Sequence, residues 1–327
     1  MTTLGTTNHP LRVAIVGSGP SGFYSAEALI DSGLDVEIDI FEKLPVPFGL
    51  VRFGVAPDHA KLKSVCQIFR NIAEQPQVRF FGNVALGADL GVEDLSGHYH
   101  ATIIATGASS DRALGVPGED LTGVHAAREF VGWYNGHPEY SSVDFDLSQE
   151  VAIVVGQGNV AIDVCRILSK SVDELRQTDI AEHALDALAS SRIREIHLIG
   201  RRGPVQAKFT AKELRELGTL PGWRPVVDPR AMDLNASSVT ELQDASATNC
   251  AKNLKVLSDF AARPARGEKQ IWLDFLNAPV AIQGDSRIEI VEIAKQRLVG
   301  PAFGQVAEPT GETFSLSGGG VVSKCRL

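Results

Sequence analysis

Two glycine-rich fingerprints stand out among the residues that could do chemistry. They are Gly17-Ser18-Gly19-Pro20-Ser21-Gly22 and Gly156-Gln157-Gly158-Asn159-Val160-Ala161, and each directly follows an apolar run and opens a helix-like segment. In such a motif the backbone amides at the start of a helix cradle a pyrophosphate. The sequence therefore predicts two dinucleotide sites, between which electrons can pass.

The first fingerprint gives each glycine a separate task. Gly17 makes the tight turn, Gly19 lets the backbone approach a pyrophosphate, and Gly22 allows close packing of helix on strand. Glu42 ends the next predicted strand, about 20 residues after Gly22, where an acid accepts hydrogen bonds from ribose hydroxyls. Together these features favour nucleotide binding over the alternative, in which the glycines serve a plain turn.

The second fingerprint ends in Ala161, which still fits helix packing. No acidic residue follows the predicted strand 195–199, and Arg201 and Arg202 stand there instead. Guanidinium groups suit a 2′-phosphate and leave NAD without its usual ribose acceptor. We therefore expect NADP(H) rather than NAD(H), against the alternative that the two arginines form a solvated surface pair.

Two further segments are candidates for ligand contact. Residues 48–59 mix glycine, proline and apolar residues as no regular element would, which predicts a ligand-shaped loop. His59 at its end could orient or protonate a reduced ring, although a structural histidine is the competing interpretation. Thr106 and Gly107 close another predicted strand, where the missing side chain of glycine permits close backbone approach to a ligand.

The elements that must position these residues form two βαβ patterns, typical of an α/β fold. In the first, strands 12–16 and 36–41 flank a helix over about 22–32, and a strand at 102–105 is expected to be buried. The pattern then repeats, and its segments are a strand at 151–155, a helix through residue 168, a charged helical stretch 169–191 and a strand at 195–199. Strand-like segments at 270–275, 279–282 and 287–293, with a turn at Gly284-Asp285, predict a small antiparallel excursion.

Composition limits the remaining classes of function. The 327 residues, 44% apolar and 22% charged, fit about two globular domains. A net charge of −9 disfavours nucleic acid and anionic membranes as partners. The sequence has no apolar run of the roughly 18 residues that span a bilayer, and its opening residues do not resemble a signal peptide, so we expect a cytoplasmic protein. The four cysteines form neither a C-x-x-C pair nor a metal-like cluster, so no metal site is expected.

Three longer strings are specific enough to indicate a family. They are residues 48–63, residues 159–164, and residues 200–214, which run Gly-Arg-Arg-Gly-Pro-Val-Gln-Ala-Lys-Phe-Thr-Ala-Lys-Glu-Leu. These strings resemble adrenodoxin reductase and the bacterial ferredoxin–NADP reductases of that type. The resemblance covers nearly the whole chain, and the strings distinguish this family from flavoproteins that share only the glycine fingerprints.

The resemblance implies an α/β fold of two Rossmann-like three-layer dinucleotide-binding domains, with the NADP domain inserted into the FAD domain. Residues 1–110 would form the N-terminal part of the FAD domain, residues 111–316 the NADP domain, and residues 317–327 the start of the return to the FAD domain. Electrons would pass from NADPH to FAD and on to a ferredoxin-like iron–sulfur protein.

By matching motif positions, the resemblance also implies site residues. FAD would contact Gly19, Ser21, Glu42, Leu50 and Val84, and NADP would contact Arg112, Gly158 to Ala161, Arg201, Arg202 and Glu213. His59 would lie beside the flavin and act with a glutamate of the second domain, for which Glu213 and Glu216 are the candidates.

An acidic iron–sulfur partner would need a basic docking face. Lys61, Lys63 and Arg70 offer one such patch, and Lys208, Lys212 and Arg215 offer another. Either group could instead be an ordinary solvated helix face.

The sequence departs from the family after residue 316. The family completes its flavin domain with a segment bearing a Gly-Trp motif and a Gly-Pro-x-Gly-x-Ile-Gly-Thr-Asn stretch, and neither follows here. We therefore expect weakened FAD binding and some exposed apolar surface.

Two alternatives to an active reductase stay open. One is a shortened, catalytically impaired nucleotide-binding paralogue. The other is a different two-nucleotide flavoprotein, such as the electron-input subunit of a glutamate synthase or a thioredoxin reductase. The cysteines argue against a different flavoprotein. A glutamate synthase subunit of this kind usually carries a cysteine-rich region and a thioredoxin reductase carries a C-x-x-C pair, and this sequence has neither.

Overall fold

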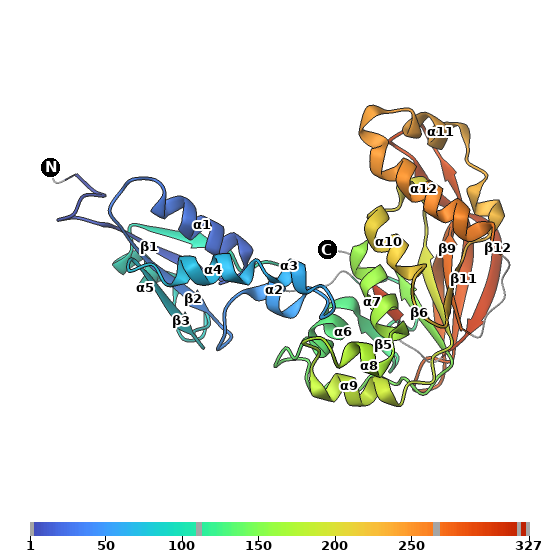
Figure 1. Ribbon diagram of the computed structural model, residues 1–327, viewed down its shortest axis with the longest axis horizontal. Coiled ribbons are helices and arrows are strands. Elements are labelled where there is room, and N and C mark those ends of the chain that lie inside the picture. Colours follow the sequence, from blue (N-terminus) through green and yellow to red (C-terminus); the bar gives the residue numbers. More distant parts are fainter. Residues whose placement is uncertain (1–2, 109–112, 264–268, 319–321, 325–327) are drawn as a thin grey trace. The chain divides into compact units, whose positions relative to one another are not determined.

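The chain divides into two compact units, Met1–Ser110 and Asp111–Leu327, each of which has its own sheet and hydrophobic core (Figure 1). The structure is a computed structural model that describes residues 3–108, 113–263, 269–318 and 322–324. Within those ranges, no helix combines the length and apolar character that crossing a bilayer requires.

The first unit is built on a four-stranded parallel sheet with the order β3-β2-β1-β4. The strands are β1 (Leu11–Val16), β2 (Val36–Glu42), β3 (Val78–Gly82) and β4 (Ala101–Ile104). The inner strand β1 is buried from Val13 to Val16 because both of its faces are covered there, as the apolar run at these residues predicts.

Helices cover both faces of this sheet. Helices α1 (Pro20–Ile30) and α4 (Cys66–Ala73) pack on one face, and α5 (Val92–His98) lies on the other (Figure 1). Short helices α2 (Gly49–Phe53) and α3 (Ala60–Lys63) connect β2 to α4. The unit is therefore a three-layer α/β arrangement, as the fold prediction required.

Three details of the first unit differ from the sequence predictions. Helix α1 begins at Pro20, because a proline fits the first turn of a helix, where its missing N–H costs nothing. The loop 48–59 contains the short helix α2. The strand expected to be buried at 102–105 is β4, and its Ile104 is 60% exposed because β4 lies at the edge of the sheet.

The second unit has a six-stranded parallel sheet with the order β5-β13-β6-β7-β9-β8. Its strands are β5 (Val124–Ala126), β6 (Val151–Val155), β7 (Glu195–Gly200), β8 (Trp223–Val226), β9 (Lys269–Phe275) and β13 (Val322–Lys324). The segment 317–327, which the resemblance assigns to the return into the first domain, thus contributes β13 to the second unit's sheet.

One face of this sheet is covered by helices and the other by a second sheet. The core on this face comes mostly from α6 (Ala127–Tyr134), α7 (Asn159–Ser169), α9 (Glu182–Ala189), α10 (Ala211–Leu217) and α12 (Thr248–Ala261), with Leu175 of α8 (Val172–Leu175). A further helix of the unit, α11 (Ala236–Leu242), contributes no residue to that core. The antiparallel sheet β10-β11-β12 packs on the opposite face through Ile282, Val291 and Ile293. Its strands are β10 (Asn277–Gln283), β11 (Ile290–Val299) and β12 (Val306–Ser317).

The predicted small antiparallel sheet is confirmed, but one of its three strands is not the predicted one. Segment 270–275 is β9, which pairs in parallel with β7 and β8 in the main sheet, so the third antiparallel strand is β12. The helical stretch 169–191 is two short helices, α8 and α9.

Candidate dinucleotide-binding sites

The first fingerprint forms a tight turn between β1 and α1. A methyl group on Gly17, which has φ of +106°, would lie 2.4 Å from the carbonyl oxygen of Ala105, and one on Gly22 would lie 2.1 Å from that of Gly17. Neither position can carry a side chain without moving the backbone. A methyl group on Gly19 would meet no atom within 4 Å, so this side of the turn is open to a ligand.

Glu42 fixes the first turn from the end of β2. Its Oε2 accepts hydrogen bonds from the Ser18 amide at 3.0 Å and the Ser18 hydroxyl at 2.7 Å, and its Oε1 accepts from the Leu44 amide at 3.1 Å. Hydrogen bonds to a charged carboxylate are stronger than neutral ones. The acid predicted to meet a ribose thus also holds the glycine turn in place.

The segment that follows β2 also contacts this turn. The Phe48 amide donates to the Ser18 carbonyl at 2.9 Å, and a methyl group on Gly49 would come within 2.9 Å of the Gly19 Cα atom. Phe48 has φ of +92°, an uncommon conformation for a bulky residue, and its ring packs against Phe23 and Phe69. The predicted ligand loop therefore lies beside the first fingerprint.

The other residues predicted to bind FAD lie on several elements of the first unit. Ser21 is exposed in the first turn of α1, Leu50 is 53% exposed on α2, and the Val84 amide donates to the Glu42 carbonyl at 2.9 Å. Ala105, which directly follows β4, packs against Gly17, and Thr106 and Gly107 come next in the chain. Gly107 has φ of +70° and open space at its Cβ position.

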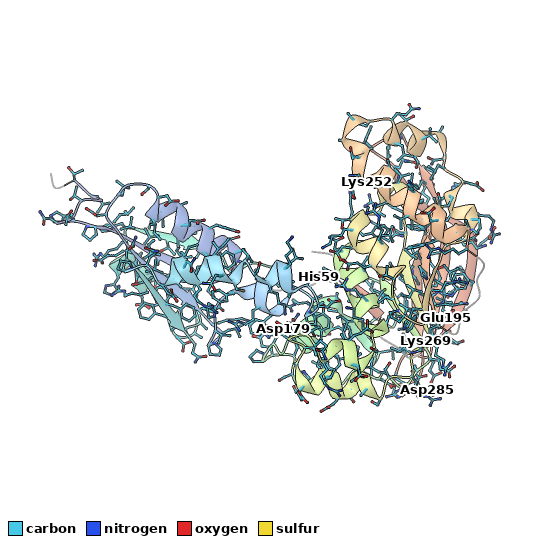
Figure 2. The ribbon with its side chains drawn as sticks, viewed as in Figure 1. His59, Asp179, Glu195, Lys252, Lys269 and Asp285 are labelled. Atoms are coloured by element: carbon cyan, nitrogen blue, oxygen red, sulfur yellow. The ribbon has the colours of Figure 1, made fainter. Side chains whose placement is uncertain are left out.

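His59 lies at the start of α3 in the first unit (Figure 2). It is half-buried, its amide donates to the Ala56 carbonyl at 3.0 Å, and its carbonyl accepts from the Leu62 amide at 2.9 Å. These bonds fix the backbone at His59. Its role beside a flavin stays a prediction.

The second fingerprint repeats the geometry of the first. The Gly156 amide donates to the Ile199 carbonyl at the end of β7, just as the Gly17 amide donates to the Phe41 carbonyl of β2, and both distances are 2.8 Å. Gly156 has φ of +148°, and a methyl group on Gly158 would meet no atom within 4 Å. Ala161 is fully buried in the position that Gly22 occupies in the first motif, so this turn accommodates a methyl group.

The second turn is hydrogen-bonded to residues 200–214, the segment that carries the two arginines and is called the arginine segment below. The Gln157 carbonyl accepts from the Lys208 amide at 2.7 Å, and the Asn159 side-chain oxygen accepts from the Thr210 amide at 2.8 Å. The Gln157 side chain fills the space in which a Cβ on Gly200 would stand. These contacts hold the fingerprint and the arginine segment together as one wall.

A cavity of about 830 Å³ opens beside this wall, entirely within the second unit. Its lining residues are Ala113, Leu114, Val155 to Val160, Ile199 to Arg202, Gln206, Lys208 and Asn277 to Pro279. Both predicted arginines and most of the predicted fingerprint residues therefore line one space, whose size suits a nucleotide. Sequence reasoning gave no role to Gln206 or residues 277–279, although Gln206 stands in the string 200–214, and it assigned Lys208 only to a docking patch.

Glu213 points into a charged cluster inside the second unit. Arg166, whose side chain is 2% exposed, lies 3.3 Å from Glu213, 3.4 Å from Glu216 and 2.7 Å from Asp163, measured between the guanidinium nitrogens and carboxylate oxygens. Burying a guanidinium group is tolerated only when carboxylates surround it in this way. Glu213 does not line the cavity, so its roles toward NADP and His59 stay predictions. Arg112 lies outside the described residues.

The two units, each with a glycine turn between a parallel strand and a helix, define a dinucleotide-dependent oxidoreductase fold. The model of the pyridine nucleotide-disulphide oxidoreductase family matches residues 11–216. The chain therefore belongs to this family.

Named relatives narrow the family further. The chain is 46% identical over 316 residues to the NADPH-ferredoxin reductase FprA of Mycobacterium tuberculosis, a match that covers 94% of this chain and 68% of the relative. It is 44% identical over 325 residues to the mitochondrial NADPH:adrenodoxin oxidoreductase of Salvelinus fontinalis, covering 95% and 64%. The solved structure of FprA in complex with NADPH matches with a TM-score of 0.91 and 45% identity, covering 96% of this chain and 70% of that one. The resemblance to adrenodoxin reductase and its bacterial relatives is confirmed, and the chain spans about two thirds of the length of these relatives.

Proposed function

We propose that this protein is an NADPH-dependent flavoprotein reductase that passes electrons to an iron–sulfur protein. NADP(H) would bind in the cavity of the second unit and FAD at the fingerprint of the first. The single observation that carries the proposal is that the cavity brings the glycine turn and both arginines into one wall. The named relatives support the proposal, since their names describe enzymes that use NADPH to reduce ferredoxin or adrenodoxin.

The residues of the second unit fit NADP. The turn from Gly156 to Gly158 and the start of α7, a helix of eleven residues, offer amide donors for a pyrophosphate. Arg201 and Arg202 follow the end of β7 and would hold the 2′-phosphate with charge-assisted hydrogen bonds. Lys208 adds a third positive charge to the cavity wall.

The residues of the first unit fit FAD. Gly17 and Gly22 are too crowded to carry side chains, and Gly19 leaves the ligand side of the turn open. Glu42 uses three of the hydrogen-bonding positions of its two oxygens on Ser18 and Leu44, which leaves acceptor capacity for a ribose hydroxyl. FAD, when bound, accepts a hydride from NADPH and releases electrons singly, and the protein's task is to hold and orient it.

His59 would orient the flavin ring or hold a proton near it. Because the flavin supplies the redox chemistry, replacing His59 by alanine should slow flavin reduction by NADPH by about tenfold rather than abolish it. Stopped-flow measurement of flavin reduction tests this expectation. His59→Ala with an unchanged reduction rate and an unchanged flavin potential would contradict a role in catalysis.

Glu213 would act mainly by positioning. Its carboxylate neutralises Arg166 together with Asp163 and Glu216, and this cluster joins α7, the helix of the second fingerprint, to α10. We therefore propose that Glu213 supports the nucleotide turn from behind, and we keep a partnership with His59 as the alternative.

The electron acceptor and the location complete the proposal. Lys61 and Arg70 are exposed in the first unit, and Lys208, Lys212 and Arg215 are exposed in the second, so either group offers positive charge to an acidic iron–sulfur protein. Lys208 also lines the nucleotide cavity, which favours the first group for docking. We propose a cytoplasmic location.

The absorbance spectrum of the purified protein tests the proposed function. A yellow protein with flavin bands that NADPH bleaches without oxygen, and that then reduces a ferredoxin, is expected. A colourless protein that still binds NADPH after incubation with FAD would favour the nucleotide-binding paralogue without reductase activity.

A further inference from the structure

A buried polar cluster lies directly behind the nucleotide cavity. It consists of Gln206, Ser238, Glu241 and Gln305, each of which is at most 9% exposed. Gln206 belongs to the arginine segment and lines the cavity, whereas Ser238 and Glu241 lie on α11. The cluster therefore connects the wall of the cavity to elements outside it.

The carboxylate of Glu241 sets the orientation of both glutamine amides. Its Oε2 accepts from the Gln206 side-chain nitrogen at 2.9 Å, and its Oε1 accepts from the Gln305 side-chain nitrogen and the Phe303 amide, both at 2.8 Å. Burial alone would raise the pKa of Glu241, but these hydrogen bonds and the charge of Arg202 outweigh burial and lower it. An ionised carboxylate only accepts hydrogen bonds, so each glutamine must turn its NH₂ group toward Glu241 and its oxygen away.

The two glutamine oxygens that point away from Glu241 differ in their hydrogen bonding. The Gln305 oxygen accepts from the Asn235 side chain at 2.7 Å. The Gln206 oxygen is buried and has no hydrogen-bond partner among the described residues. It lies beside the arginine segment, since a methyl group on Gly203 would come within 3.0 Å of it. A buried acceptor without a donor costs free energy unless a ligand or water supplies one.

We propose that Gln206 is a specificity-determining residue of the nucleotide cavity, whose side-chain oxygen accepts a hydrogen bond from the adenosine half of NADP(H). This inference rests on the proposed function. The cavity wall is otherwise rich in donors, namely Arg201, Arg202, Lys208 and the amides of the glycine turn, which serve phosphates. A fixed acceptor beside the arginines instead suits an O–H or N–H donor, which is either a ribose hydroxyl or the amino group of adenine.

Equilibrium binding of NADPH to the wild-type protein, Gln206→Met and Gln305→Met tests the proposal. Each substitution keeps the side-chain length and removes one amide donor from Glu241, but only the first removes the buried, unpartnered oxygen of a residue that lines the cavity. We expect Gln206→Met to weaken NADPH binding about tenfold, the effect of losing one buried hydrogen bond, and Gln305→Met to change it by less than about twofold. An unchanged Kd in Gln206→Met, or an equal loss in both variants, would overturn the proposal.

Reduced nicotinamide hypoxanthine dinucleotide phosphate, which lacks the adenine amino group, separates the two donors. If the amino group is the donor, the wild-type protein prefers NADPH about tenfold and Gln206→Met does not discriminate. If a ribose hydroxyl is the donor, Gln206→Met weakens both ligands by the same factor. A wild-type protein that binds no NADPH would overturn the proposed function as well, whereas tight wild-type binding unchanged in Gln206→Met would overturn this inference alone.

Discussion

The two glycine turns share one backbone design but are held by different means. In the first unit a single carboxylate, Glu42, binds Ser18 and Leu44 and so fixes the turn from the neighbouring strand. In the second unit the turn is fixed by Gln157 and Asn159, which accept from the amides of Lys208 and Thr210. The comparison teaches that one motif can be held by an acid that also suits a ribose, or by the segment that carries the phosphate-binding arginines.

The two turns also differ in how much of a site surrounds them within their own unit. The second turn forms one wall of a cavity of about 830 Å³. The first lies beside β4, an edge strand with the exposed Ile104 at its end. We therefore expect the NADP site to tolerate single substitutions better than the FAD site.

The largest expected effect comes from Gly22→Val. The new side chain would place its Cβ 2.1 Å from the Gly17 carbonyl oxygen, so the first turn must distort at a cost of about 3 kcal/mol or more. We expect no bound FAD, measured by flavin absorbance after denaturation, and unchanged NADPH binding in the second unit. Gly97→Val is the matched control, because Gly97 is an exposed residue of α5 in the same unit and its added Cβ meets no protein atom within 4 Å. Normal FAD content in Gly22→Val would show that the first turn does not hold the flavin.

The next largest effect is expected from replacing Arg201 and Arg202 together by alanine. Each arginine offers a charge-assisted hydrogen bond worth about 1.5–3 kcal/mol to a phosphate, so NADPH binding should weaken by about 100-fold or more. NADH lacks the 2′-phosphate and should bind as before. Lys212→Ala is the control, since Lys212 is exposed on the neighbouring helix and does not line the cavity. Equal losses for both cofactors would contradict the phosphate assignment.

A smaller effect is expected from Glu42→Gln. The amide cannot accept from Ser18 and Leu44 as strongly as a carboxylate, so the first turn loosens and FAD affinity should fall about tenfold. Fluorescence titration with FAD measures this change. Glu37→Gln, an exposed acid on the same strand, is the matched control. If both variants bound FAD like the wild type, Glu42 would not be the anchor of the first site.

The smallest effect concerns His197 in the second unit, whose ring lies between Asp274 at 2.6 Å and Glu195 at 2.8 Å (Figure 2 labels Glu195). Burial lowers the pKa of His197, but the two carboxylates outweigh burial and raise it above 6.5. The interaction of the protonated His197 ring with the two carboxylates stabilises the folded state. This stabilisation is complete below about pH 6.5 and is lost as the pH rises through the raised pKa of His197 in the folded protein. The difference in unfolding free energy between the wild type and His197→Gln should shrink as the pH rises above 6.5. A difference that grew with pH would contradict this account.

Much of the fold could be predicted because it depends on local patterns. Strand β6 and residues 13–16 of β1 are continuous apolar runs, whereas Glu37 and Asp39 interrupt the run in β2 and His197 interrupts that in β7. Each strand is followed by its glycine turn or its charged end as expected. The cavity was also predictable in part, since the string 200–214 contains Arg201, Arg202 and Lys208.

The features that were missed depend on contacts between distant segments. The exposure of β4 follows from its place at the sheet edge, which no residue of β4 determines. The role inferred for Gln206 depends on Glu241 and Gln305, whose positions follow from the folding of α11 and the antiparallel sheet. The hydrogen bond from Ser18 to Glu42 was missed for the same reason, although the sequence analysis named both residues.

The most direct test of the account is whether FAD and NADPH occupy separate sites at the same time. Equilibrium dialysis with both coenzymes should give one FAD and one NADPH per chain, and saturating FAD should leave NADPH bound. Gly22→Val should then lose only FAD, and the double arginine variant only NADPH. Displacement of NADPH by FAD, or loss of both coenzymes in either variant, would contradict the claim that the two glycine turns hold different nucleotides.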